Sequence, residues 1–129
     1  MNQPNGTDLK GVRVLIVEDT WHTATAMKAA LERVEMVVIG PTATTSDARR
    51  LIATHKPSLA LIDVNLKGEM AGGLIEELHA QGIPVIVASG YAVPAVAKEK
   101  VVRFLQKPFS GGQLIEAIRA AVSAEPATG

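Results

Sequence analysis

The chain has 129 residues, with 13 basic side chains, 13 acidic side chains and no cysteine. This length suits a single domain, and the balanced charge disfavours broad binding to nucleic-acid phosphates. The absence of cysteine excludes disulfides, thiolate nucleophiles and cysteine-based zinc sites. Met1–Lys10 lacks the apolar stretch of a secretory signal, and no apolar run approaches the roughly 20 residues of a transmembrane helix. We therefore expect a cytoplasmic protein that binds neither nucleic acid nor membranes.

Five short apolar runs alternate along the chain with segments of helical periodicity. The runs are rich in Val, Ile and Leu without clean alternation, which is typical of strands buried on both faces of a parallel sheet. They cover Val12–Val17, Met36–Ile39, Ser58–Asp63, Pro84–Ala88 and Val101–Leu105. The last run is more mixed in composition, so we expect it at an edge of the sheet.

Four other segments carry apolar side chains on one face of a helix. Their members are Ala24, Met27, Leu31 and Val34; Ala48, Leu51, Ile52 and His55; Leu74, Ile75 and Leu78; and Leu114, Ile118, Ala121 and Val122. The second segment follows the start signal Thr44-x-x-Asp47, and the last follows the capping box Ser110-Gly-Gly-Gln113. Ser89–Lys100 contains a proline and no long stripe, so any helix there should be short.

Strands that alternate with helices form βαβ units, and these build a parallel sheet with right-handed crossovers. We expect an α/β fold with a flavodoxin-like, doubly wound sheet of five parallel strands in the order 2-1-3-4-5, with helices on both faces. The domain is expected to span residues 11–123, between loose polar tails at 1–10 and 124–129.

Polar side chains stand where the expected strands end. The first strand runs into Glu18 and Asp19, the third ends on Asp63, the fourth reaches Ser89 and the fifth leads to Lys107. Ligands of open α/β sheets bind outside the carboxyl ends of the strands, so these five side chains are expected at one rim. Each alone has a simpler interpretation, since an acid after a strand is often a helix N-cap, and the serine and lysine fit turns.

The three carboxylates predict a metal site. Close carboxylates raise one another's pKa unless a cation lies among them, and Mg²⁺ prefers such oxygen ligands. We expect Glu18, Asp19 and Asp63 to bind Mg²⁺, with the main-chain carbonyl of Asn65 as a further ligand.

The same rim predicts phosphoryl transfer. Lys107 can neutralise a phosphoryl oxygen as a point charge, and the Ser89 hydroxyl can donate to another. Asp63 is the expected acceptor, because a carboxylate is a nucleophile from which no proton need be removed. Catalysis would then consist mainly of positioning and charge neutralisation.

Over about Val12–Val122 the sequence resembles the receiver domains of two-component response regulators. Val14–Asp19 is similar to the family's first strand and acidic pair, and Ala60–Leu66 to its phosphoacceptor strand. Ser89-Gly90 matches the hydroxyl residue with its small neighbour, and Phe104–Phe109 matches the switch aromatic followed by Lys-Pro.

The resemblance implies that a sensor histidine kinase phosphorylates Asp63 from a phosphohistidine, with Mg²⁺ as cofactor. It assigns contacts with the phosphoryl group to Ser89, Gly90 and Lys107, a conformational switch to Ser89, Phe104 and Tyr91, and a cis peptide bond to Pro108. It further implies a phosphoacceptor that gains and loses phosphate by itself, not an enzyme. No effector domain follows the last expected helix in this sequence, so a downstream protein target or phosphotransfer protein would receive the signal.

Ile83–Tyr91 also resembles the PFxFATGY motif of certain stand-alone receivers that work with kinases of the HWE and related families. Val87 replaces the second Phe of that motif and Ser89 its Thr. Trp21, the only tryptophan, stands two residues after Asp19. It either packs onto the first helix or lies beside the metal as a reporter, and we favour the second.

Other functions remain open. An aspartate-nucleophile phosphohydrolase of the haloacid dehalogenase type needs Asp-x-Asp, whereas Asp63 is followed at that spacing by Asn65. A flavin carrier on the same fold needs a phosphate loop where Glu18 and Asp19 stand. A degenerate receiver that acts only as a binding module would keep the fold without responding to Mg²⁺.

Overall fold

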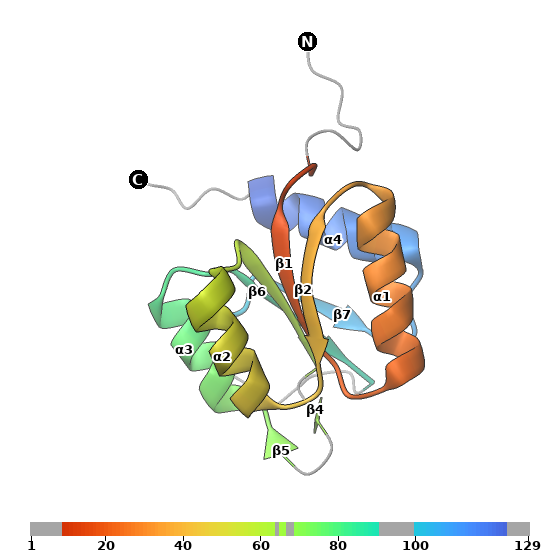
Figure 1. Cartoon of the computed structure of the whole chain (residues 1–129). Helices are drawn as coiled ribbons and strands as arrows, with labels where there is room; N and C mark the ends of the chain where they lie inside the picture. The colour runs from red at the N-terminus through yellow and green to blue at the C-terminus, as the bar shows by residue number, and fades with distance from the viewer. Residues whose placement is uncertain (1–8, 64, 67–68, 91–99, 124–129) are drawn as a thin grey trace.

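The computed structural model describes residues 9–63, 65–66, 69–90 and 100–123. Its elements in chain order are β1 (Arg13–Val17), α1 (Trp21–Arg33), β2 (Val37–Thr42), α2 (Thr45–His55), β3 (Leu59–Asp63), β4 (Asn65–Leu66), β5 (Glu69–Met70), α3 (Gly72–Ala80), β6 (Val85–Ser89), β7 (Arg103–Gln106) and α4 (Gly111–Ser123). Five strands form a parallel sheet in the order β2-β1-β3-β6-β7 (Figure 1). This order confirms the expected flavodoxin-like α/β fold.

Helices cover both faces of the sheet, α2 and α3 on one and α1 and α4 on the other (Figure 1). Alternation along β1 shows how one strand serves both layers. Leu15 and Val17 pack with α2 and α3, whereas Val14 and Ile16 pack with α1 and α4. Successive side chains of a strand point to opposite faces, so a strand covered on both sides must be apolar throughout.

The expected helix starts are confirmed. The Thr44 hydroxyl accepts a hydrogen bond from the amide of Asp47 at 3.1 Å. At the start of α4, the Gln113 amide donates to the Ser110 hydroxyl at 3.0 Å, and the Ser110 amide donates to the Gln113 side chain at 2.8 Å. Both pairs satisfy amides that have no partner inside the helix.

Two members of the expected helical stripes are not in the core. His55 is exposed, and Val122 is 40% exposed. Each lies in the last turn of its helix, beyond Ile52 and Ala121, the last buried residues of α2 and α4. In both helices the spacing of the stripe therefore continues beyond the last residue that packs against the sheet.

The second strand runs beyond Ile39 to Thr42, across a cis Gly40-Pro41 bond. Its pairing with β1 shifts register between Leu15 and Val17. Proline is tolerated here because β2 is an edge strand, paired on one side only. The short antiparallel pair β4-β5 was not expected from the sequence.

The N-terminal tail expected over residues 1–10 is too long. Leu9 is fully buried among side chains of the α1 and α4 layer. Lys10 pairs with Glu35 at 3.4 Å, and the Gly11 amide donates to the Glu35 carbonyl at 2.9 Å. A single apolar residue cannot form a periodic pattern. The sequence therefore gave no reason to expect that Leu9 is buried.

The short helix expected within Ser89–Lys100 falls mostly on residues 91–99, outside the described part of the chain. Among the described residues, no helix combines the length and the apolar character needed to cross a bilayer.

Candidate functional site: an acidic cluster at the carboxyl end of the sheet

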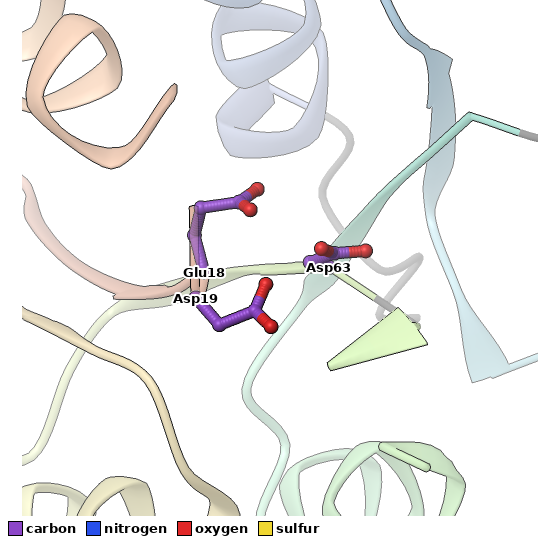
Figure 2. Close-up of side chains that lie close together, drawn as sticks. All are labelled: Glu18, Asp19 and Asp63. Carbon is purple, nitrogen blue, oxygen red and sulfur yellow. The ribbon is translucent and has the colours of Figure 1, made fainter. Parts of the chain in front are cut away.

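Three carboxylates meet where β1 and β3 end side by side. Glu18 and Asp19 follow β1, and Asp63 is the last residue of β3 (Figure 2). One carboxylate oxygen from each lies within 4.8 Å of the others. Glu18 and Asp63 are buried, and Asp19 is half-buried. Parallel strands place their carboxyl ends at one edge, which is why two distant segments form one cluster.

Lys107 supplies a positive charge to this cluster from the end of β7. Its Nζ donates to Glu18 Oε1 at 2.8 Å and to Asp63 Oδ2 at 3.4 Å. The Lys107 amide also donates to the Ser89 carbonyl at 2.8 Å, which ties the lysine to the end of β6. The contact with Glu18 is thus the shorter of the two charge-assisted bonds.

Glu18 is held at every polar atom of its side chain. The side chain is fully buried, Oε1 accepts from Lys107, and Oε2 accepts from the Thr20 amide at 3.1 Å. Its main-chain amide donates to the Thr42 carbonyl at 2.9 Å. Burial raises the pKa of Glu18, the hydrogen bond from Lys107 lowers it, and the charge of Asp63 raises it again, so the pKa lies above its ordinary value.

The ammonium of Lys107 is stabilised in its charged form. Burial alone would lower the pKa of Lys107, but the hydrogen bond to Glu18 and the charges of Glu18 and Asp63 outweigh burial and raise it. The pKa values of both partners are raised, although an ion pair alone would lower that of the carboxyl. The pKa of Glu18 rises nevertheless, because its side chain is more completely buried than that of Lys107. At 2.8 Å we describe the pair as an ammonium donating to a carboxylate.

The other expected site residues lie along the same rim or outside the described chain. Ser89 is buried at the end of β6, one residue past Ala88, which pairs with Asp63. Among the described residues, none lies within 4 Å of a Cβ built at Gly90. The backbone of Asn65 lies in β4, two residues past Asp63. Tyr91 lies outside the described residues.

Phe104 lies in β7, and Lys107 and Pro108 follow this strand directly. Phe104 is half-buried and packs against the apolar cluster under α2 and α3. The bond between Lys107 and Pro108 is cis.

Residues 14–119 match the family model of the response regulator receiver domain. The chain belongs to this family. No curated protein matches it in the corresponding search.

Solved receiver domains share the fold. The signal receiver domain of a putative Luxo repressor protein from Vibrio parahaemolyticus is 24% identical, with a TM-score of 0.77 over 87% of this chain and 90% of that one. A response regulator receiver domain protein from Methanospirillum hungatei is 26% identical, with a TM-score of 0.73 over 85% and 92%. The receiver domain of the sensor histidine kinase PA1611 from Pseudomonas aeruginosa is 20% identical, with a TM-score of 0.78 over 88% and 99%. That structure is described with a magnesium ion in its active-site cleft.

In this receiver, Trp21 lies at the surface, two residues after Asp19 of the acidic cluster. It is the first residue of α1 and is 72% exposed. Its ring meets the His22 ring edge-on, with centroids 5.3 Å apart. Trp21 is thus not part of the core, and the expectation that it lies beside the metal as a reporter stays a prediction, as does the alternative that it packs onto the first helix.

A groove of about 330 Å³ lies between α1 and the loop from β7 to α4. Its lining includes Ala26, Met27, Phe109 and Leu114, and it also includes Lys107. The groove therefore borders the acidic cluster. Sequence reasoning missed it, because Met27 and Phe109 come from segments far apart in the chain and only the fold brings them together.

Thr20 and Thr42 were also missed as parts of the site. Both act through main-chain atoms, the amide of Thr20 and the carbonyl of Thr42. Main-chain contacts place no demand on side-chain identity, so no sequence pattern could have revealed them.

Proposed function

We propose that this receiver accepts a phosphoryl group from a sensor histidine kinase on Asp63, with Mg²⁺ held by the acidic cluster. The observation that carries the proposal is the position of Asp63. Its carboxylate lies beside those of Glu18 and Asp19, and Lys107 donates to it at 3.4 Å. A nucleophilic oxygen, ligands for a hard cation and a point charge for a phosphoryl oxygen are thus together.

The cluster suits Mg²⁺ in ligand type and in size. Mg²⁺ binds oxygen at about 2.0–2.1 Å in octahedral geometry, so opposite ligands stand roughly 4.2 Å apart. The three carboxylate oxygens lie within 4.8 Å of one another, close to that span. Glu18, Asp19 and Asp63 would hold the ion with the main-chain carbonyl of Asn65, and waters would complete its shell. When bound, Mg²⁺ neutralises negative charge on the phosphoryl oxygens.

The chain's own residues supply the rest of the chemistry. An Asp63 carboxylate oxygen bonds to phosphorus while the bond from phosphorus to the donor imidazole breaks, and the imidazole leaves with that electron pair. The product is an acyl phosphate on Asp63, and no general base is needed. Lys107 offsets the charge of the phosphoryl group, to which the Ser89 hydroxyl and the Gly90 amide can donate.

A protein donor is supported by the surface around the cluster. Exposed Trp21 and the apolar groove beside Lys107 flank the rim, and tryptophan is among the residues that most often anchor protein interfaces. We propose a cytoplasmic histidine kinase as this donor. An HWE-type kinase is supported only by the Ile83–Tyr91 segment, in which Val85, like Val87 and Ser89, departs from the motif.

Output would pass through a conformational change to a downstream protein target or phosphotransfer protein. When the phosphoryl group draws the Ser89 hydroxyl toward itself, Phe104 gains room to turn inward. Tyr91 would belong to the surface through which the downstream protein recognises this conformational change. In this proposal the receiver is a phosphoacceptor that loses its phosphate by its own hydrolysis, not an enzyme with an external substrate.

The test is intact mass spectrometry after incubation with acetyl phosphate and Mg²⁺. Wild type should gain one phosphoryl group and Asp63→Asn none. Asp47→Asn, at a half-buried residue of α2 outside the acidic cluster, should gain the same as wild type. A hydroxylamine-labile adduct that persists in Asp63→Asn and maps to Asp19 would overturn the assignment. Continuous phosphate release from a small phosphate ester would favour the phosphohydrolase, and no adduct with no Mg²⁺ binding would favour the degenerate binding module.

A further inference from the structure

Trp21 is the largest apolar side chain that the described surface exposes. Among the described residues, four large apolar side chains are exposed, and Trp21 is the only aromatic one, with 72% of its area open to solvent. A single exposed apolar residue is common on any protein. Tryptophan, however, is the residue type that most often anchors an interface, and this one lies beside a groove.

The groove between α1 and the loop from β7 to α4 suits an aromatic ring. Its lining includes His22, the residue that the Trp21 ring contacts, so the ring and the groove are neighbours. Met27 and Phe109 line it as well, and a thioether and a phenyl ring both make favourable contacts with a further ring. Its volume of about 330 Å³ is near the lower end for ligand cavities, which suits one large side chain.

Trp21 does not reach the groove of its own chain. His22, Ala26 and Ala30 share one face of α1, because they are spaced by four residues. Trp21 precedes His22, and one step along a helix turns the side chain by about 100°. Its exposure agrees with this orientation. An aromatic ring that fills the groove therefore comes from another molecule.

The lining of the groove permits contact with an identical surface. Lys107 is its only lysine, arginine, aspartate or glutamate, and the ammonium already donates to Glu18 at 2.8 Å. Two copies can therefore meet at this groove without repulsion between like charges. A surface that carries both a protruding side chain and a groove for it is self-complementary, as a two-fold dimer requires.

We propose that two copies of this chain associate about a two-fold axis, with Trp21 of each copy inserted into the groove of the other. Two anchors alone make a weak contact, so the dimer forms in concentrated solution and the monomer prevails in dilute solution. The groove borders the acidic cluster, so the dimer would occupy the approach of the proposed histidine kinase. That consequence rests on the proposed function, whereas the dimer itself does not.

Sedimentation velocity between about 5 µM and about 500 µM, the range in which weak association becomes visible, tests the dimer. Wild type should sediment faster as its concentration rises, whereas Trp21→Ala should remain a monomer. The control is Val122→Ala, which shortens another exposed apolar side chain and should associate as wild type does. A wild type that stays monomeric over the whole range would overturn the proposal, as would equal association of Trp21→Ala and wild type.

The groove is tested by Ala26→Glu, which places a charge in the lining at an exposed position and leaves Trp21 intact. This variant should associate at least about tenfold more weakly than wild type. Ala53→Glu makes the same change at an exposed position of α2, on the other face of the sheet, and should associate as wild type does. Equal weakening in the two variants would mean that added charge is responsible, and would overturn the groove as the site.

Mixing two variants gives a readout that a loss of folding cannot imitate. Trp21→Ala keeps the groove but has no tryptophan, and Ala26→Glu keeps the single tryptophan but not the groove. An excess of Trp21→Ala should shift the emission of dilute Ala26→Glu to shorter wavelength, because the indole ring leaves water for the groove. An excess of the double variant Trp21→Ala/Ala26→Glu should not. Unshifted emission, or the same shift with the double variant, would overturn the insertion of Trp21.

Discussion

The amide of Glu18 donates to the carbonyl of Thr42 at 2.9 Å, so the acidic pair is tied to the end of the edge strand β2. The backbone between this contact and the core of β2 passes through Gly40, which has a φ of +94°. A Cβ at Gly40 would lie 3.0 Å from the Thr42 nitrogen and 3.1 Å from the Ile16 oxygen. Both of these atoms belong to the backbone, so no flexible side chain can move aside to make room for the added Cβ.

Gly40→Ala should therefore cost more stability than a left-handed backbone alone explains. The control is Gly82→Ala, which also has positive φ, +76°, but open space around the added Cβ. We expect about 1 kcal/mol of destabilisation for Gly82→Ala and at least about 1 kcal/mol more for Gly40→Ala, by urea unfolding. Gly40→Ala should also weaken Mg²⁺ binding, because Thr42 positions Glu18. Equal costs at the two glycines would contradict the close approach.

Ser110→Ala should destabilise the protein by about 1 kcal/mol, because it removes the acceptor of the Gln113 amide and breaks the capping box of α4. Ser123→Ala is the control at the other end of the helix, where the hydroxyl donates to the Arg119 carbonyl. That change should cost less than about 0.5 kcal/mol. Denaturation midpoints that fall equally in the two variants would show that the cap contributes little.

Glu77 should stabilise the fold in a manner that depends on pH. The hydrogen bond from Arg49 holds the pKa of Glu77 below its ordinary value of 4.5, so this contribution is present above pH 4.5 and is lost as the pH falls through the folded-state pKa. Both side chains are 46% exposed, so Glu77→Gln should cost only about 0.5 kcal/mol at neutral pH.

The difference between Glu77→Gln and wild type should shrink in urea unfolding as the pH is lowered stepwise below 4.5, and it should vanish once the Glu77 carboxyl is protonated in the folded as well as in the unfolded protein. Glu76→Gln, whose contact with Lys100 is 3.8 Å, is the neighbouring control and should cost nothing measurable. A cost at Glu77 that is unchanged in acid would show that charge is not its source.

Mg²⁺ should change the emission intensity of Trp21 with little shift in wavelength. The ring already lies largely in water, and a nearby dication alters its surroundings through the local field and reordered water. Asp19→Asn should abolish or weaken the response, whereas Asp47→Asn should respond as wild type. Equal titration curves for wild type and Asp19→Asn would count against the site.

Beryllofluoride, a mimic of the acyl phosphate, should slow amide hydrogen exchange in Tyr91–Lys100. The sequence motivates this, since the segment holds Pro94 and few large apolar anchors, and weakly anchored segments are where switches are found. Leu114–Val122 in α4 is the internal reference. If Tyr91–Lys100 is as protected as the reference with and without the mimic, the switch lies elsewhere.

The fold could be predicted from sequence because its signals are local and repeated. Continuous apolar strands such as Leu59–Asp63 and the stripes of α1 and α4 record burial directly in the order of residues. The acidic cluster was predictable for a similar reason, since a parallel sheet brings its strand ends to one edge regardless of sequence detail.

What could not be predicted depends on distances between segments. That Lys107 bonds more closely to Glu18 than to Asp63 follows from side-chain reach across neighbouring strands. The extension of β2 through Pro41 depends on which edge of that strand stays unpaired. The burial of Leu9 depends on apolar side chains from distant segments, among them α1 and α4, that only the fold brings around it.

The buried Leu9 and the direction of α4 also fix how this receiver can be attached to anything else. The chain enters the fold at the start of β1, and α4, which follows β7 back across the sheet, ends at Ser123 on the same side, opposite β4 and the acidic cluster (Figure 1). A surface, label or protein linked at either point therefore leaves the rim around Asp63 facing outward. Immobilised through either end, the receiver would still present its acceptor to a partner arriving from solution.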